Sequence, residues 1–197
     1  MVVQAGGRPR NPDIDRAIIA AALDEVAELG YAEASITGIA RRAAVPKSTV
    51  YRRWDSKQDL IIEAIAHLDP HPPTESTGDV RVDVFNQMAH LVGQWEDKLA
   101  SAVMLAVITE VARNPELYAV WNERFVTPFR ERISAVLARG IASGRIRRDC
   151  DVDLVAELML ALPLHAKMRP HPVDLSDLAE RFTNTLFEGL LKKNATK

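Results

Sequence analysis

Apolar residues recur every three or four positions along most of the chain, which is the spacing of amphipathic α-helices. We find neither the alternation that predicts strands nor an internal repeat. Glycine, proline and polar residues separate the periodic segments, which cover residues 13–29, 57–68, 80–98, 99–113, 114–143, 152–167 and 175–191. With two further short helices between residues 35 and 54, the pattern predicts an all-α fold of about nine helices.

Residues 35–60 read as a helix, a tight turn, a second helix and the beginning of a third. Ser35 can cap the first helix with its hydroxyl. The turn at residues 44–46 ends in Pro46, whose fixed backbone angle suits the start of a helix. This order of elements predicts a helix-turn-helix within an N-terminal three-helix unit.

The second short helix, which we place at residues 47–54, has one apolar side. Val50 and Trp54 are four positions apart and can both face the core. The other sides carry Lys47, Ser48, Thr49, Tyr51, Arg52 and Arg53. A short helix that shows hydroxyls, a phenol and cations fits the major groove of DNA. The alternative is an ordinary basic surface.

Basic residues gather on this stretch, although the whole chain has a net charge of only −2. Between Ser35 and Lys57 the only acid is Asp55, whereas the six basic residues are Arg41, Arg42, Lys47, Arg52, Arg53 and Lys57. A local basic patch is the electrostatic footprint of nucleic-acid binding. The partner that the charge pattern predicts is therefore double-stranded DNA.

An N-terminal arm carries Arg8 and Arg10 on either side of Pro9, which keeps the chain extended. Such an arm can lie in a narrow, A·T-rich minor groove. A solvated tail that orders nowhere is an equally good interpretation.

The run from Ile39 to Leu60, IARRAAVPKSTVYRRWDSKQDL, resembles the DNA-binding motif of the tetracycline-repressor family of bacterial transcription regulators. The matching residues are Ile39, Ala40, Val45, Lys47, Thr49, Tyr51, Trp54, Ser56 and Lys57. Three residues depart from the usual pattern, in which glycine, serine and glycine stand in place of Ala44, Pro46 and Ser48. Gly38 also stands where an acidic residue often completes the cap of the first short helix.

The resemblance implies that Lys47, Thr49 and Tyr51 touch phosphates or bases. Arg52 and Arg53 are placed to reach base edges or backbone, and Lys57 can pair with a phosphate at the start of the next helix. The resemblance further implies a ligand-responsive regulator that binds a palindromic operator as a homodimer. We expect a repressor, while an activator remains an alternative.

Prolines and a glycine between residues 69 and 79 predict a domain boundary. We assign residues 1–68 to the arm, the helix-turn-helix domain and a link helix. Residues 69–197 then form a larger helical domain for effector binding and dimerisation. The resemblance implies that its last two helices, with apolar faces around Leu158 and Phe182, pair with those of a second copy. The alternative is that these faces complete the core of the monomer.

An effector cavity is the second expected site. Pro128 and Pro163 fall inside long helices and should kink them, and splayed helices can enclose a cavity. We expect it to hold a small, mostly apolar effector. The candidate lining residues are Met88, Trp95, Met104, Trp121, Phe125 and His165. For most of the apolar ones a place in the plain core is the commoner role.

Other classes of protein find little support in the sequence. Cys150 is the only cysteine, so no intrachain disulfide can form, which fits a reducing cytosol. No apolar run approaches the ~18 residues that span a membrane, and the first residues lack the apolar stretch of a signal peptide. No zinc spacing, phosphate loop or nucleophile motif is present. We therefore expect a cytoplasmic protein with no cofactor, metal site or catalytic residue. The opposing hypothesis is a helical small-molecule-binding protein or enzyme in which the helix-turn-helix is incidental.

Overall fold

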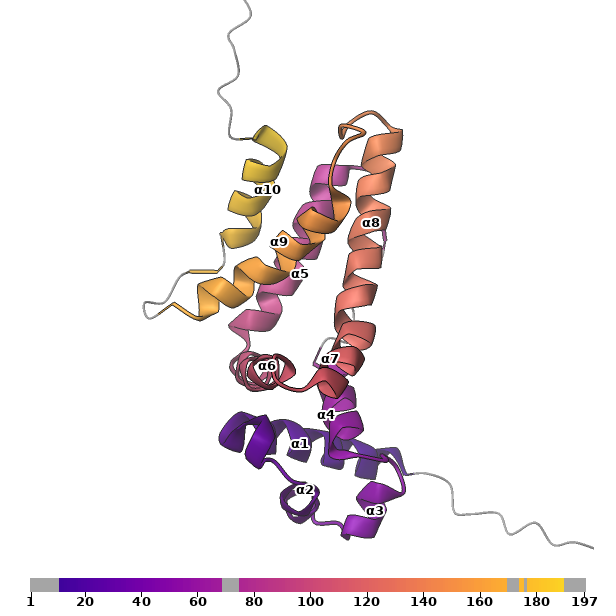
Figure 1. Cartoon of the computed structure of the whole chain (residues 1–197), viewed down its shortest axis with the longest axis vertical. Helices are drawn as coiled ribbons and strands as arrows, with labels where there is room; N and C mark the ends of the chain where they lie inside the picture. The colour runs from indigo at the N-terminus through magenta and orange to yellow at the C-terminus, as the bar shows by residue number, and fades with distance from the viewer. Residues whose placement is uncertain (1–10, 69–74, 170–173, 176, 190–197) are drawn as a thin grey trace, which may run out of the picture.

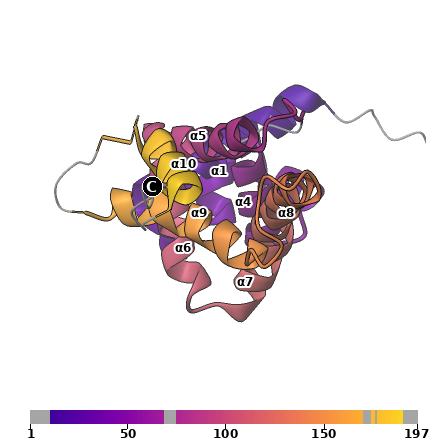
Figure 2. The same cartoon turned by 90° about the horizontal axis from the view of Figure 1, so that it is seen from above.

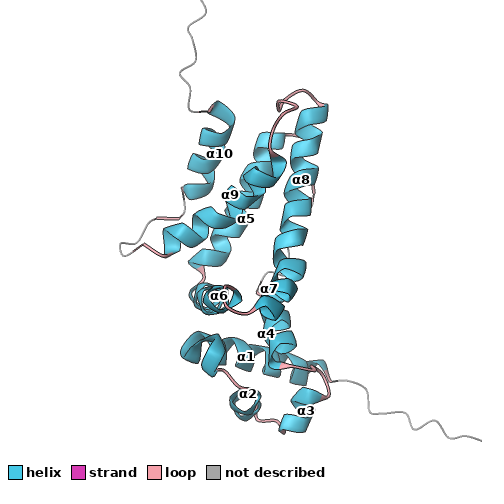
Figure 3. Cartoon of the chain, viewed as in Figure 1, coloured by secondary structure: helices cyan, strands magenta, loops and turns pink. Residues whose placement is uncertain are grey.

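The computed structural model describes residues 11–68, 75–169, 174–175 and 177–189. Within these ranges the chain forms helices joined by loops and turns (Figure 3), so the predicted all-α fold is confirmed. The helices are α1 Pro12–Glu33, α2 Ile36–Arg42, α3 Lys47–Tyr51, α4 Lys57–Ala66, α5 Val80–Glu96, α6 Lys98–Val111, α7 Pro115–Trp121, the π-helical turn η1 Asn122–Val126, α8 Thr127–Ala142, α9 Val152–Lys167 and α10 Leu178–Glu188. With the continuous run α7–η1–α8 taken as one helix, the described residues contain nine, as predicted.

The helices form a small N-terminal unit and a larger bundle (Figure 1). Helices α1, α2 and α3 lie together at one end, and α4 leads away from them. Helix α6 packs across α1, and above it the long helices α5 and α8 run steeply away from the small unit, while α9 crosses the bundle obliquely. Seen from above, α9 crosses towards α8, while α10 lies on the other side of the bundle, where it packs on α5 (Figure 2).

Two hydrophobic cores hold this arrangement. The first joins the small unit to the bundle, since Ile18, Ile39 and Leu60 are packed in one cluster with Val107 of α6 and Leu117 of α7. The second lies among α5, α8, α9 and α10. Partly buried Met104 and Ile108 of α6 touch both clusters. The N-terminal helices are therefore packed directly on the helices that carry the rest of the bundle.

Proline interrupts the long helix predicted at residues 114–143, but as an inserted turn and not as a simple kink. The backbone N–H of Thr127 donates to the carbonyl of Asn122, five residues back. Pro128 has no N–H to donate, and its ring crowds the carbonyl four residues earlier, so regular α-helical bonding fails here. The helix accommodates this break by forming the π-helical turn η1 just before Thr127. Pro163, in contrast, lies inside α9 without ending it.

Polar side chains cap the first turns of several helices. The side chains of Asn114 and Asp151 accept the backbone N–H of Leu117 and Leu154 and so cap α7 and α9. The last helix is shorter than the predicted range 175–191, because it begins at Leu178 and ends before Gly189, whose φ is 72°.

Candidate DNA interface and effector cavity

Helix α2 begins as its sequence predicts, since the Ser35 hydroxyl accepts the backbone N–H of Gly38 at 3.0 Å. Helix α3 starts at Lys47 after Pro46, which supplies no side-chain cap. It ends at Tyr51, three residues before the predicted end, and Arg52 and Arg53 lie in the turn that follows. Val50 and Trp54 are buried, as predicted.

The turn between α2 and α3 contains a strained residue. Ala44 has a φ of 54°, the left-handed region that glycine adopts at no steric cost. Its side chain is exposed, so nothing around it requires the methyl group. The departure from the usual turn glycine therefore costs stability.

We expect Ala44→Gly to raise the free energy of unfolding by about 1 kcal/mol, because relief of the left-handed strain outweighs the extra freedom of glycine in the unfolded chain. Chemical denaturation at a fixed protein concentration measures the change. Gly93→Ala, in the exposed interior of α5, is the reverse control and should also stabilise the protein. A loss of stability in Ala44→Gly would show that the turn is not strained.

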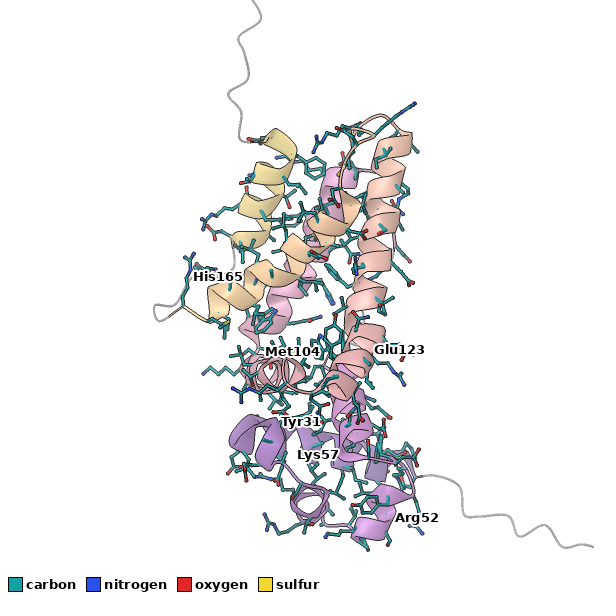
Figure 4. The ribbon with its side chains drawn as sticks, in the orientation of Figure 1. Tyr31, Arg52, Lys57, Met104, Glu123 and His165 are labelled. Carbon is teal, nitrogen blue, oxygen red and sulfur yellow. The ribbon has the colours of Figure 1, made fainter. Side chains whose placement is uncertain are left out.

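One side of α3 and the turn after it is open to solvent. Lys47, Ser48, Tyr51 and Arg52 are exposed there, and 55% of Tyr51 is accessible. Figure 4 shows Arg52 at the extreme end of the molecule, well away from the bundle. The Arg52 guanidinium donates to the Thr49 hydroxyl at 3.3 Å, which orients it across this surface. We call the polar and cationic surface formed by Lys47, Ser48, Tyr51 and Arg52 the α3 face.

Thr49 and Arg53 lie under the α3 face and not on it. Thr49 is buried. The Arg53 side chain is only 9% exposed, where it forms an ion pair with Asp15 of α1 and donates to the Thr49 carbonyl at 3.0 Å. Both therefore have polar partners within the protein, and contact of either residue with DNA stays a prediction. They fix α3 against α1 and so position the residues above them.

Lys57 is also occupied within the protein. Its ammonium donates to the carbonyl oxygens of Tyr31, Ala32 and Ala34 at 2.9, 3.3 and 3.0 Å. It lies 4.6 Å from the centre of the Tyr31 ring, and Figure 4 shows the two side by side. Burial lowers the pKa of Lys57 and raises that of Tyr31. Lys57 thus satisfies the carbonyls exposed where α1 breaks at Gly30, and its contact with a phosphate stays a prediction.

An ion pair with a buried carboxylate joins α1 to α2. Glu25 of α1 is 2% exposed, and its carboxylate accepts from the Arg42 guanidinium, which also pairs with the exposed Glu28. A Cβ atom on Gly38 would lie 1.7 Å from the Glu25 carboxylate. Glycine replaces the usual acidic residue at this position because the Glu25 carboxylate occupies the space that a side chain would need.

A cavity of about 470 Å³ lies between the helices of the bundle. It is lined mostly by apolar side chains of α5, α6, α7, η1, α8 and α9, together with Ala66 at the end of α4. Four of the predicted residues line it: Trp95, Met104, Trp121 and Phe125. The rings of Trp121 and Phe125 pack against each other, with their centres 4.7 Å apart.

The other two predicted cavity residues lie elsewhere. Met88 is completely buried in the second core, among α5, α8 and α9. His165 is exposed on the outer end of α9, away from the cavity (Figure 4). Neither residue lines the cavity, because an apolar or polar residue at helical spacing does not reveal which side of its helix faces a cavity.

The cavity also has a few polar groups in its wall. They are His90, Gln94, Asn122, Arg124, Arg132 and Glu157. Gln94 lies 3.3 Å from the ring of His90, and the Asn122 amide donates to Thr127 at 3.4 Å.

The outer side of α9 carries an exposed apolar stripe, which we call the α9 seam. Leu154 and Leu158, one turn apart, are 50% and 49% exposed. Helix α10 buries Leu178 and Ala179, and its Phe182 and Leu186 pack partly against the second core. In the part of the chain that the structure describes, nothing covers the α9 seam.

Two predicted features lie outside these elements. Arg8 and Arg10 of the arm are outside the described residues, as is the loop at residues 69–74. Within the described ranges, no cluster of His, Cys, Asp or Glu has the size needed to hold a metal ion. None of the described helices combines the length and apolar character needed to cross a bilayer.

Comparison with known proteins identifies two family models along the chain. The model for bacterial regulatory proteins of the tetR family matches residues 18–64, and that for the tetracyclin repressor-like C-terminal domain matches residues 74–186. An uncharacterized HTH-type transcriptional regulator of Mycobacterium tuberculosis is 31% identical over 153 residues, which cover 74% of this chain and 73% of that protein.

Solved structures have the same fold. The fatty acid degradation regulator FadR from Bacillus halodurans aligns with a TM-score of 0.76 at 23% identity, over 89% of this chain and 99% of the other. FadR from Bacillus subtilis in complex with stearoyl-CoA aligns with a TM-score of 0.69, also at 23% identity and the same coverage. Both likenesses concern the arrangement of helices.

Proposed function

The chain belongs to the tetR family of bacterial regulatory proteins and is a ligand-responsive, DNA-binding transcriptional regulator, and we propose that it represses transcription as a homodimer on a palindromic operator. The α3 face is the observation that carries this proposal. It is polar, cationic and exposed at the end of the molecule. The buried Thr49 and Trp54 and the ion pair of Arg53 with Asp15 pack the other side of this segment against the core. In a helix-turn-helix dimer, two such helices enter successive major grooves about 34–36 Å apart.

We expect the α3 face to contact both the bases and the phosphates of the operator. Tyr51 and Arg52 project from the end of the helix and supply an aromatic ring and a planar guanidinium for base edges. Lys47 and Ser48 stand at the helix start, where the backbone N–H groups favour a phosphate. Arg41 of α2 is a further exposed cation of the helix-turn-helix.

We expect Tyr51→Ala and Arg52→Ala each to weaken operator binding by about 1–3 kcal/mol, because each removes a base contact. Lys47→Ala should weaken binding to all DNA sequences and reduce the salt dependence, because it removes a phosphate contact. Fluorescence anisotropy with an operator selected from random DNA measures both effects. Arg148→Ala is the matched control, since Arg148 is exposed in the α8–α9 loop far from α3. Normal affinity in both Tyr51→Ala and Arg52→Ala, with folding intact, would remove the α3 face from the interface.

The dimer is proposed to form through α9 and α10. The α9 seam supplies exposed leucines, and the partly buried Phe182 and Leu186 of α10 lie beside the second core. Large apolar stripes that stay exposed on one helix mark an association surface. Two copies joined by these helices would present two α3 faces to one operator.

The cavity is proposed to bind the effector. Its volume lies in the range of small-molecule sites, and its walls are mainly apolar with a few polar groups. The name of one structural neighbour refers to fatty acid degradation and another was solved with stearoyl-CoA, which favours an effector with a long apolar part.

The walls of the cavity also connect it to the DNA-binding unit. Ala66 ends α4, whose first turn follows the α3 face, and the Gln58 amide of α4 donates to the Glu116 carbonyl of α7 at 3.2 Å. An effector that prefers a different placement of α7 would move α4 and change the spacing of the two α3 faces.

Trp121 would be a poor choice for testing this site, although it lines the cavity. It is buried in the first core, which extends into the DNA-binding unit. Trp121→Ala would therefore lower stability together with effector affinity.

A further inference from the structure

The charged groups on the cavity wall are mainly cationic. Arg124 of η1 and Arg132 of α8 line it, whereas Glu157 of α9 is the only carboxylate that the described residues contribute to the lining. The Glu157 carboxylate lies 4.0 Å from the guanidinium of Arg130, which also pairs with Asp153 at 3.2 Å. The acid is thus partly neutralised from outside the cavity, while the two arginines belong to the wall.

The π-helical turn brings these two arginines to one side of the helix. Arg124 and Arg132 are eight positions apart, which in a regular α-helix would separate them by about 80° around the axis. The turn at Asn122–Val126 takes in about one extra residue, which reduces this angle to about 20°. The interruption at Pro128 therefore aligns two cations that regular helical geometry would separate.

The two arginines also differ in depth. Arg132 is half-buried, and its guanidinium lies 5.7 Å from the centre of the Phe129 ring, against the apolar wall. Arg124 is exposed, and no described residue forms an ion pair with it. One cation therefore stands inside the cavity and the other at its rim, with Trp95, Met104 and Phe125 forming apolar walls.

We propose that the effector is an amphiphile with an anionic head, a carboxylate or a phosphate, that binds between Arg124 and Arg132 while its apolar tail lies along Trp95, Met104 and Leu164. A guanidinium binds either anion with paired, charge-assisted hydrogen bonds. This inference rests on the proposed function of the cavity and names the chemistry of its ligand. Without the head contact, an apolar tail alone would bind without a fixed orientation.

Decanoate and decanol test this inference, because they share one tail and differ in the charge of the head. Binding to the full-length protein can be followed by the fluorescence of Trp95 and Trp121, which both line the cavity. We expect decanoate to bind at least about tenfold more tightly than decanol, as a charge-assisted hydrogen bond predicts. Decanoyl-CoA separates the two anion sources, since tighter binding than decanoate assigns the site to phosphate.

Variants of Arg124 and Glu157 test where the anionic head of the effector binds. Arg124→Gln should reduce the preference for decanoate about tenfold and leave decanol binding unchanged, and because Arg124 is exposed the variant should fold. Glu157→Gln should strengthen decanoate binding, since it removes a carboxylate from the wall. Arg148→Gln removes the same charge far from the cavity and should change nothing.

Equal affinity for decanoate and decanol, or an unaltered preference in Arg124→Gln, would overturn the anionic head site. Operator release is measured alongside in order to separate this failure from that of the proposed function. If both compounds release the operator equally, the cavity remains an effector site and only the head assignment fails. If compounds that bind the protein leave the operator complex intact, the effector role of the cavity itself fails.

Discussion

Leu158→Glu should produce folded monomers that bind the operator about 100-fold more weakly than the wild-type protein. Leu158 is half exposed on the α9 seam, so a carboxylate there costs the isolated monomer little. In a dimer the same carboxylate would be buried in an apolar seam without a partner, which is strongly unfavourable. A monomer contacts a single half-site and loses the affinity that two recognition helices supply together.

Sedimentation velocity at micromolar concentration measures the first effect, and anisotropy with the full operator measures the second. Leu29→Glu is the matched control, because Leu29 is 46% exposed on α1 and receives the same change of side chain away from the seam. Phe182 and Leu186 are less suitable targets, since both pack partly on the second core and a charge there could unfold the domain. If Leu158→Glu still sediments as a dimer, the α9 seam is not the interface.

Arg42→Ala should lower the free energy of unfolding clearly more than the loss of an exposed ion pair does, because it leaves the buried Glu25 carboxylate without its cationic partner. The effect should concentrate in the N-terminal unit, where the pair joins α1 to α2. Denaturation followed by circular dichroism at one fixed protein concentration measures it, since dimerisation makes stability depend on concentration.

Glu28→Ala supplies the control within the same ion-pair cluster. Glu28 also pairs with Arg42, but its side chain is 62% exposed, so its loss should cost less than about 1 kcal/mol. The contrast between the two variants isolates burial as the cause. Equal losses would mean that Arg42 acts through surface charge or packing, and the buried pair would lose its assigned role.

Local sequence patterns predicted the helices well, because helix periodicity and capping depend on residues close together in the chain. The caps at Ser35, Asn114 and Asp151 and the break at Gly30 all follow from their own sequence neighbours. The exposed positions of Tyr51 and Arg52 follow in the same way, since the buried Val50 and Trp54 fix the opposite side. The exact end of α3 was not predicted, because it depends on the turn that Arg53 makes against α1.

The roles of the remaining cations depend on partners far away in the sequence. Arg53 meets Asp15, and Lys57 meets the carbonyls around Tyr31, and no spacing rule connects these residues. The residues that line the cavity were also hard to predict. Met88 and Met104 both lie at helical spacing among apolar residues, yet Met88 fills the core and Met104 lines the cavity. The π-helical turn added a further difficulty, because an inserted residue changes which positions share a side.

Ala66 ends α4, the helix that follows the α3 face, and also forms part of the cavity wall, so one helix links the two proposed binding sites. Thermodynamic linkage then requires the influence to run in both directions with equal size. An effector that weakens operator binding by a given factor must itself be bound more weakly, by that same factor, when operator DNA is present. With a typical coupling free energy of about 1–3 kcal/mol, the concentration of effector needed for a half-maximal response would rise about 5–150-fold on the operator complex. Effector affinity measured on the free protein would then overstate its sensitivity in the presence of DNA.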